Sequence, residues 1–187
     1  VLGFGDIETF PFLDLPDTRL VSDGYRTLEE LGAVDPDGGL TAIGRQLALL
    51  PVDPRIARML LAATDQQCLQ EVLIIAAALS VLDPRERPLD RQLAADEIHA
   101  TFNLPESDFL AFLNLWGFLS RERMALSKCQ FRKLCQRHFL SWNRVQEWRD
   151  IHAQLLEQMT EMGFKLNQSP LPAGRGAAQS ATTAITP

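Results

Sequence analysis

The stretch LTAIGRQLALLPVDPRIARMLLAA, residues 40–63, contains most of the signals that decide the fold. Thr41 is placed to cap a helix, and Gly44 lies inside that helix at a cost of about 1 kcal/mol relative to Ala. A glycine at such a position indicates that another backbone passes close by. Pro51 stops the helix, and an Asp-Pro pair at residues 53–54 starts the next one with a capping carboxylate and a proline at the first helical position.

The residues before this stretch complete a small module. Asp17 is a good N-cap for a helix that Gly32 is placed to end. The segment AVDPDGGLT, residues 33–41, then predicts a short hairpin around a Pro-Asp-Gly-Gly turn. The order helix, minimal hairpin, helix is typical of a winged-helix domain, which we expect over residues 17–52 after an opening segment over residues 1–16.

The residues after it predict a helical bundle. CLQEVLIIAAALSVL, residues 68–82, is apolar all round and therefore predicts a central buried helix, because it is shorter than the roughly 20 residues that cross a bilayer. Amphipathic helices are expected around it, near residues 94–102, 108–119 (capped by Ser107), 127–136 and 141–162. The fold class is thus all-α, with a helical domain over residues 53–165 and a flexible tail over residues 166–187.

Composition points to an intracellular fragment. The chain has no initiator Met and no secretory leader at its start, which predicts a piece of a longer protein. Its three cysteines are an odd number without a framework spacing, as is typical of a reducing compartment. We therefore expect a cytoplasmic location without membrane contact.

The charge is spread unevenly along the chain. Residues 121–150 hold eight basic and three acidic side chains, a local balance of +5, whereas the remainder holds ten basic and 21 acidic ones, a balance of −11. This asymmetry predicts one anion-facing surface on an otherwise acidic body. The alternative is a solvated helix face whose cations pair with carboxylates elsewhere.

No motif in the chain predicts catalysis. DEIH, residues 96–99, resembles the Mg²⁺-binding motif of a helicase ATPase, but helical residues precede it where that motif needs a strand, so we expect an exposed helix turn. A phosphate-binding loop is missing, and GFGD, residues 3–6, lacks the third glycine of a dinucleotide site. Cys129, Cys135 and His138 do not make a zinc site, because six helical residues place the two sulfurs about 120° apart.

The basic stretch is the remaining candidate site. If residues 133–144 formed one continuous helix, Lys133, Arg137 and Arg144 would lie within about 40° of one another and form a stripe that follows phosphates. Trp142 and Trp148 lie nearby as possible stacking surfaces, although aromatic residues at helical spacing more often belong to the core.

Five stretches carry a resemblance that goes further. In chain order they are LEELGAVD (28–35), GGLTAIGRQLALLPVDPRIARMLLAA (38–63), CLQEVLIIAAALSVLDPRERP (68–88), SDFLAFLNLW (107–116) and FLSWNRVQEWRDIHAQL (139–155). Together they closely resemble the C-terminal winged-helix and helicase-associated (ratchet-like) region of DEAH-box RNA helicases, most of all the bacterial HrpA type.

The resemblance implies a role in an ATP-driven machine. In that family two RecA-like motor domains bind ATP and Mg²⁺, and single-stranded RNA passes between them and this region. The fragment itself would then hold no cofactor, would act with the motor domains of its own chain, and would belong to a monomer. We expect RNA contacts from five basic residues: Lys128, Arg132, Lys133, Arg137 and Arg144.

Two other functions stay open from the sequence. The region could be a protein-interaction scaffold that docks its basic face on the motor domains or on a partner without touching RNA. A free-standing winged-helix DNA-binding regulator is the third candidate, but the few basic residues near 41–50 make a recognition helix there a poor fit.

Overall fold

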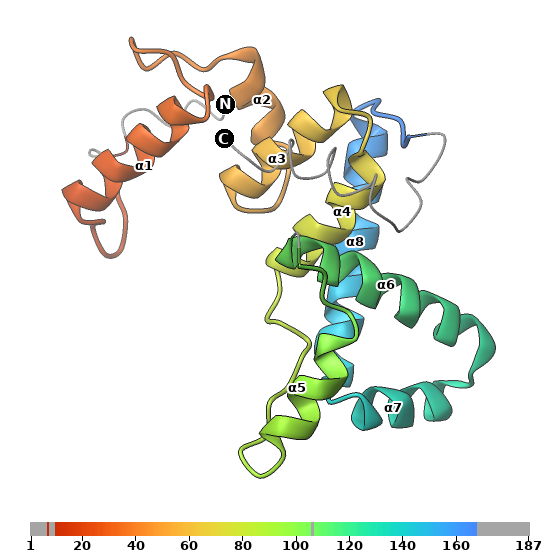
Figure 1. Cartoon of the computed structure of the whole chain (residues 1–187). Helices are drawn as coiled ribbons and strands as arrows, with labels where there is room; N and C mark the ends of the chain where they lie inside the picture. Colours follow the sequence, from red (N-terminus) through yellow and green to blue (C-terminus); the bar gives the residue numbers. More distant parts are fainter. Residues whose placement is uncertain (1–6, 8–9, 106, 168–187) are drawn as a thin grey trace. The chain divides into compact units, whose positions relative to one another are not determined.

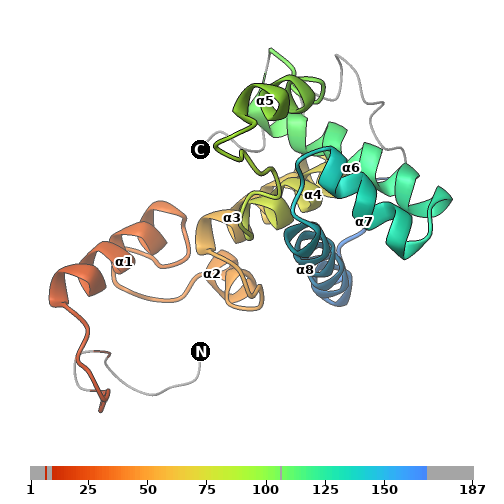
Figure 2. The same cartoon turned by 90° about the horizontal axis from the view of Figure 1, so that it is seen from below.

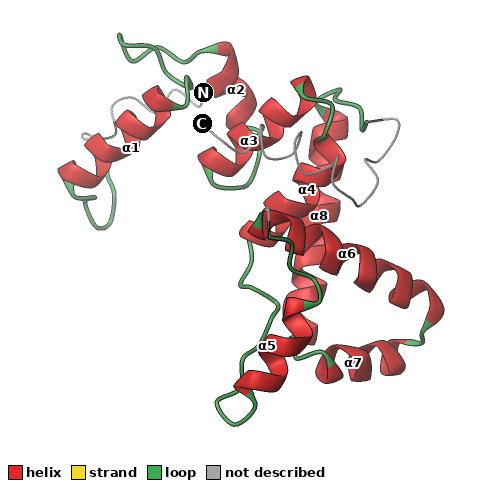
Figure 3. Cartoon of the chain, in the orientation of Figure 1, coloured by secondary structure: helices red, strands yellow, loops and turns green. Residues whose placement is uncertain are grey.

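The computed structural model describes residues 7, 10–105 and 107–167 of the chain, and these residues form eight α-helices (Figures 1 and 3). The helices are α1 (Thr18–Glu30), α2 (Ala42–Leu47), α3 (Pro54–Asp65), α4 (Leu69–Leu79), α5 (Gln92–Ala100), α6 (Asp108–Ala125), α7 (Lys128–Arg137) and α8 (Trp142–Glu161). Between them, β pairing in the described residues is limited to isolated bridges. The predicted all-α class is confirmed. The GFGD motif at residues 3–6 and residues 168–187 of the predicted tail lie outside the described residues.

The chain divides into two compact units, residues 1–58 and 59–187. In the first, α1 begins as predicted, because the Asp17 carboxylate accepts a hydrogen bond from the Arg19 backbone N–H at 2.8 Å. The helix ends at Glu30, and Gly32 follows its C-cap, Leu31, with a φ of +69° that suits a glycine. The predicted hairpin is reduced to a single antiparallel bridge between Val34 and Leu40.

Gly44 in α2 lies against another backbone, as its position in the sequence predicted. A Cβ atom at this residue would overlap the carbonyl group of Ala33. Thr41 holds that contact in place, because its hydroxyl donates to the Gly32 carbonyl at 2.6 Å and accepts from the Gly44 N–H at 3.0 Å. Thr41, the N-cap of α2, therefore also holds α2 close to the residues that follow α1.

The start of α3 also follows the sequence. The Asp53 carboxylate accepts from the Arg55 N–H at 2.8 Å, and Pro54 is the first helical residue. Leu60 and Ala63 on its inner face are fully buried.

In the second unit, α4 is the central helix. Eight consecutive residues, 71–78, are buried, and α6 and α8 pack along it (Figures 1 and 2). The helix ends three residues earlier than predicted, where the Ser80 N–H bonds back to the Ala76 carbonyl. No helix of the described residues is long and apolar enough to cross a membrane.

Trp148 fixes α8 to α4. Its ring is completely buried and its Nε1–H donates to the Ile74 carbonyl at 2.9 Å. The ring also meets Trp116 and Phe112 of α6 edge-on, with centroids 4.9 and 6.0 Å away. One side chain thus joins three helices.

Asn167 binds the start of α4 from the far end of the chain. Its Oδ1 accepts from the Gln70 N–H at 3.0 Å, and its Nδ2 donates to the buried Glu71 carboxylate at 3.1 Å. Asn167, which the sequence assigned to the tail, is therefore held by a contact between distant parts of the chain.

Burial makes His152 on α8 a pH-sensitive point of the core. Burial, together with the positive charge of Arg149, lowers the pKa of His152 from 6.5 to about 4, while its ring packs on Trp116 at a centroid distance of 4.6 Å. The folded chain then binds fewer protons than the unfolded chain between these two values. Stability should therefore fall as pH drops from about 6.5 to about 4, by roughly 2 kcal/mol in total.

Urea unfolding at pH 7.5 and at steps down to pH 4.5 measures this effect. His152→Gln is the control, because it cannot take up a proton in this range. The carboxylates titrate in both proteins, so the difference between the two pH profiles isolates His152. Parallel profiles would show that His152 does not titrate as its surroundings predict.

Candidate nucleic-acid interface

The helix α7, which carries most of the predicted RNA contacts, is specified locally at both ends. Ser127 and Gln130 form a capping box, in which the Gln130 side chain accepts from the Ser127 N–H at 2.9 Å. At the other end, Nδ1 of His138 lies 2.9 Å from the Leu134 carbonyl. These contacts fix where α7 begins and where it ends.

One face of α7 belongs to the core. Phe131 and Cys135 are fully buried and Leu134 nearly so. Burial raises the pKa of the Cys135 thiol to about 11, so this cysteine stays protonated and serves in packing. Cys129 is exposed on the opposite side, and the described residues contain no group of three His, Cys, Asp or Glu side chains that could hold a metal ion.

Residues 133–144 do not form the one continuous helix that the predicted stripe requires, because the chain turns between α7 and α8. Phe139 has a φ of +51°, and the turn is pinned to the segment after α4. There Glu86 N–H donates to the Phe139 carbonyl and Ser141 N–H donates to the Pro84 carbonyl, each at 2.8 Å. Arg144 therefore lies on a different helix from Lys133 and Arg137.

Arg144 takes part in the same junction. Its Nη1 donates to the Asp83 carbonyl at 3.1 Å. The Asp83 carboxylate is paired with Arg85 at 2.6 Å. Burial favours the neutral form of Asp83, but hydrogen bonds from Arg85 outweigh it and lower the pKa of Asp83. Arg144 thus has a structural contact and lies on α8, whereas the other four predicted residues lie on α7.

The four basic residues of α7 are exposed and form no ion pair with a described residue. In the part of the chain that the structure describes, ion pairs within 4.0 Å join Arg26 to Glu30, Arg85 to Asp83, Arg87 to Asp96 and Arg91 to Asp90. No cation of α7 is among them. The alternative that these cations pair with carboxylates elsewhere in the chain thus finds no support in the described residues. The four residues are Lys128, Arg132, Lys133 and Arg137.

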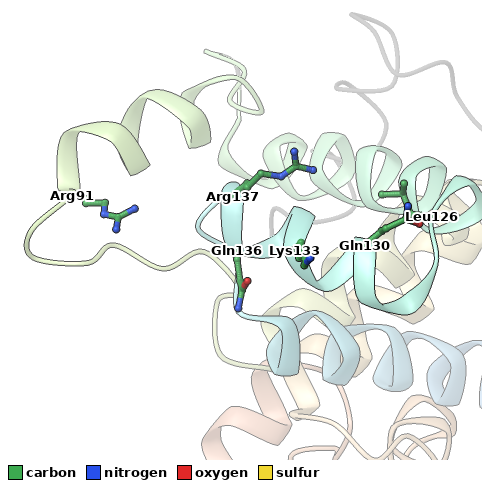
Figure 4. A pocket seen from close by; sticks show the side chains of 6 residues that line it. All are labelled: Arg91, Leu126, Gln130, Lys133, Gln136 and Arg137. Carbon is green, nitrogen blue, oxygen red and sulfur yellow. The ribbon is translucent and has the colours of Figure 1, made fainter.

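These four residues form two pairs on different sides of α7. At about 100° per residue, the members of each pair lie about 40° apart and the two pairs about 140° apart. We call Lys133 and Arg137 the hollow pair, because they line an open surface hollow of about 680 Å³, and Lys128 and Arg132 the outer pair, because they do not (Figure 4).

Arg91 is the member of this site that sequence reasoning missed. It precedes α5 and lines the hollow from the side opposite α7 (Figure 4). The rest of the lining comes from α7 and the residue before its cap: Leu126, Gln130 and Gln136 beside the hollow pair. The basic run in PRERPLDR was the one signal available, but nothing in the sequence linked it to residues some 40 positions later.

Trp142 and Trp148, the two possible stacking surfaces, differ in how deeply they are buried. Trp148 is buried in the core and cannot stack on a base, which confirms the core interpretation for this residue. Trp142 is half-buried, and its ring lies edge-on to Phe131 at a centroid distance of 5.6 Å.

DEIH lies on a helix, as expected. Asp96 forms an ion pair with Arg87 at 2.6 Å, and the hydrogen bond from Arg87 lowers the pKa of Asp96. Nε2 of His99 lies 3.1 Å from the His138 carbonyl and 3.2 Å from the Phe139 carbonyl. Two of these four residues thus have structural partners.

The models of two known protein families match adjoining parts of the chain. "Helicase associated domain (HA2), winged-helix" matches residues 25–52, and "Helicase associated domain (HA2), ratchet-like" matches residues 53–139.

Individual relatives agree with these matches. The chain is 51% identical over 174 residues, or 90% of its length, to the ATP-dependent RNA helicase HrpA of Escherichia coli (strain K12), and 50% identical over 89% of its length to the HrpA homolog of Haemophilus influenzae. It is 30% identical over 84% of its length to the pre-mRNA-splicing factor ATP-dependent RNA helicase prp22 of Schizosaccharomyces pombe. In each case it spans 13% of the relative's length. The chain therefore belongs to the helicase-associated (HA2) family and carries the winged-helix and ratchet-like parts found in bacterial DEAH-box RNA helicases of the HrpA type.

Proposed function

We propose that this chain is the accessory region of a DEAH-box ATP-dependent RNA helicase, where it guides single-stranded RNA and couples the motor to it. The observation that carries the proposal is the solvent face of α7, with four exposed cations that no carboxylate of the described residues neutralises. Such a face on a chain of net charge −6 attracts phosphates locally while the rest of the surface repels them.

The remainder of the proposed machine lies outside this chain. The relatives named above are RNA helicases, and the chain corresponds to 13% of their length. ATP and Mg²⁺ would be bound by RecA-like motor domains elsewhere in the parent protein, and this chain would contribute contacts to RNA and to those domains. A cytoplasmic location and a monomeric state belong to the same proposal.

Neutralising the α7 cations should weaken RNA binding. Changing Lys128, Arg132, Lys133 and Arg137 together to Gln keeps helix propensity and removes four charges. Each lost phosphate contact should reduce the salt dependence of log K by about 0.7. Fluorescence polarisation of a labelled oligouridylate against the 187-residue chain, at several salt concentrations, measures both affinity and slope. In the parent protein, the same change should lower unwinding and spare RNA-independent ATP hydrolysis.

The matched control removes four exposed arginines elsewhere. Arg19, Arg26, Arg55 and Arg121 are exposed and lie outside α7. Their joint change to Gln alters the net charge equally. If the two fourfold variants lose the same affinity, only the net charge matters, and the α7 face has no special role.

Protein docking is the second candidate, and a specific observation favours it. No residue of α1 is buried, although the helix is amphipathic, and Leu20 and Tyr25 are 69% and 48% exposed. An apolar helix face of this kind suits a partner surface. Unchanged RNA affinity in the fourfold α7 variant, together with loss of motor stability when the region is deleted, would favour docking over RNA contact.

A free-standing winged-helix DNA-binding regulator is the weakest of the three candidate functions. Helix α2, where a recognition helix would lie, has six residues and one basic side chain, Arg45. The guanidinium of Arg45 donates to the Leu40 carbonyl at 3.1 Å. This leaves α2 with little to offer to a DNA groove.

A further inference from the structure

The hollow beside α7 gathers three cations from two segments that are distant in the sequence. Arg91 comes from the residue before α5, and the hollow pair comes from the second half of α7 (Figure 4). The outer pair has the same composition and the same spacing but faces away from the hollow. The fold therefore distinguishes two cation pairs that the sequence presents as equivalent.

We propose that this basic hollow is a phosphate-binding subsite for the backbone of single-stranded RNA, with Arg91, Lys133 and Arg137 as the phosphate ligands. The inference rests on the proposed function. It adds a distinction between the cations that bind phosphates directly and those that only attract RNA at a distance. The outer pair acts through its field, which salt screens over about 10 Å. The hollow pair and Arg91 make direct contacts.

The chemistry of the lining favours a phosphodiester. Among the described residues, no carboxylate lines the hollow, while two guanidinium groups and an ammonium do. Guanidinium forks match the oxygens of a phosphate in a bidentate manner. Asp90, at 3.6 Å, is the one ion-pair partner that Arg91 has among the described residues. Both side chains are more than two-thirds exposed, so water screens this pair and a phosphate can compete for Arg91.

The lining also argues against base recognition and against a peptide ligand. Within the part of the chain that the structure describes, Leu126 is the apolar residue of the lining, and the lining contains no aromatic ring. Bases that bind without sequence preference stack on aromatic rings, and a bound peptide helix needs several apolar anchors. A hollow with cations and side-chain amides and one leucine therefore suits a sugar-phosphate backbone.

The size fits a piece of a strand. A volume of about 680 Å³ falls within the roughly 300–1,000 Å³ of pockets that hold small organic ligands, so there is room for more than one phosphate group. The hollow is open to solvent, which a continuous polymer requires because its two ends must leave the site.

The test compares the two pairs on the full 187-residue chain. Lys133→Gln with Arg137→Gln changes the hollow pair, and Lys128→Gln with Arg132→Gln changes the outer pair. Each double variant loses one lysine and one arginine spaced four residues apart on the same helix. We expect the hollow variant to bind a fluorescent oligouridylate at least ~10-fold more weakly and the outer variant less than ~3-fold.

A single change tests the contribution from outside α7. Arg91→Gln should weaken oligouridylate binding ~5-fold. Arg121 is an exposed arginine on α6 that does not line the hollow, so Arg121→Gln should leave binding unchanged. All the substituted side chains are exposed, so circular dichroism should give each variant the wild-type thermal midpoint.

Each other outcome has a definite meaning. Equal losses in the two double variants would overturn the hollow as a subsite and leave the proposed RNA contact of α7 intact. No loss in either double variant, nor in the fourfold variant, would overturn both. If the hollow variant loses binding to labelled polyglutamate but keeps its affinity for oligouridylate, the hollow is a site for an acidic protein segment, and the phosphate assignment is wrong.

Discussion

Replacing Gly44 with alanine is expected to unfold the winged-helix segment. The new Cβ would overlap the carbonyl group of Ala33 and approach Cδ1 of Leu40 to 2.7 Å. The Ala33 carbonyl cannot move away easily, because the Thr41 backbone N–H donates to it at 3.0 Å. Overpacking against fixed backbone should cost about 3 kcal/mol or more, a large share of the stability of so small a unit.

A second glycine provides the control. Gly24 lies inside α1 with nothing within 4 Å of its Cβ position, so Gly24→Ala should stabilise α1 by up to ~1 kcal/mol. Backbone amide NMR signals of residues 18–50 report on this unit directly. Tryptophan fluorescence does not, because all three tryptophans lie within residues 116–148. Native signals in the Gly44 variant would show that α2 can shift away from Ala33.

Truncating Trp148 should be the most damaging change in the helical unit. Trp148→Ala removes a completely buried indole that contacts α6 and donates a hydrogen bond to the Ile74 carbonyl. Cavity formation after such a change typically costs 3–5 kcal/mol, so we expect the free energy of unfolding to fall by about 4 kcal/mol.

Urea unfolding followed by far-UV circular dichroism measures the loss without relying on the tryptophan that is removed. The matched control is Trp142→Ala on the same helix. Because Trp142 is only half-buried, its truncation should cost about 1–2 kcal/mol. A similar cost for the two variants would mean that the contact between α8 and α4 does not depend on the indole.

The elements whose ends are fixed by neighbouring residues could be predicted from the sequence. Asp17, Thr41 and Ser107 each cap the helix that the sequence assigned to them. Each of these caps needs only a side-chain oxygen two or three residues from a backbone N–H. Gly44 belongs to the same class, because a glycine in a helix already points to a close neighbour.

The candidate site could be predicted only in part. The cations of α7 could be found because all four lie on one helix, and helical spacing divides them into two pairs. Which pair lines the hollow depends on how α7 packs. Arg91 lines the hollow with residues about 40 positions later, and Asn167 is bonded to a residue 97 positions earlier. Arg144 was grouped with α7 although Phe139 turns the chain between the two helices. Such contacts follow from packing, and no local pattern encodes them.

The junction between the segment after α4 and the turn before α8 also bears on how the unit folds. The bridge between Arg85 and Leu140 closes the chain into a loop that contains α5, α6 and α7. Closing a loop of this length costs conformational entropy that is recovered only when the enclosed helices pack. The hydrogen bonds of the junction should therefore form late in folding. In this order of folding, α4 pairs with its neighbours first and the junction closes last. Closing the junction completes the surface on which the basic hollow lies.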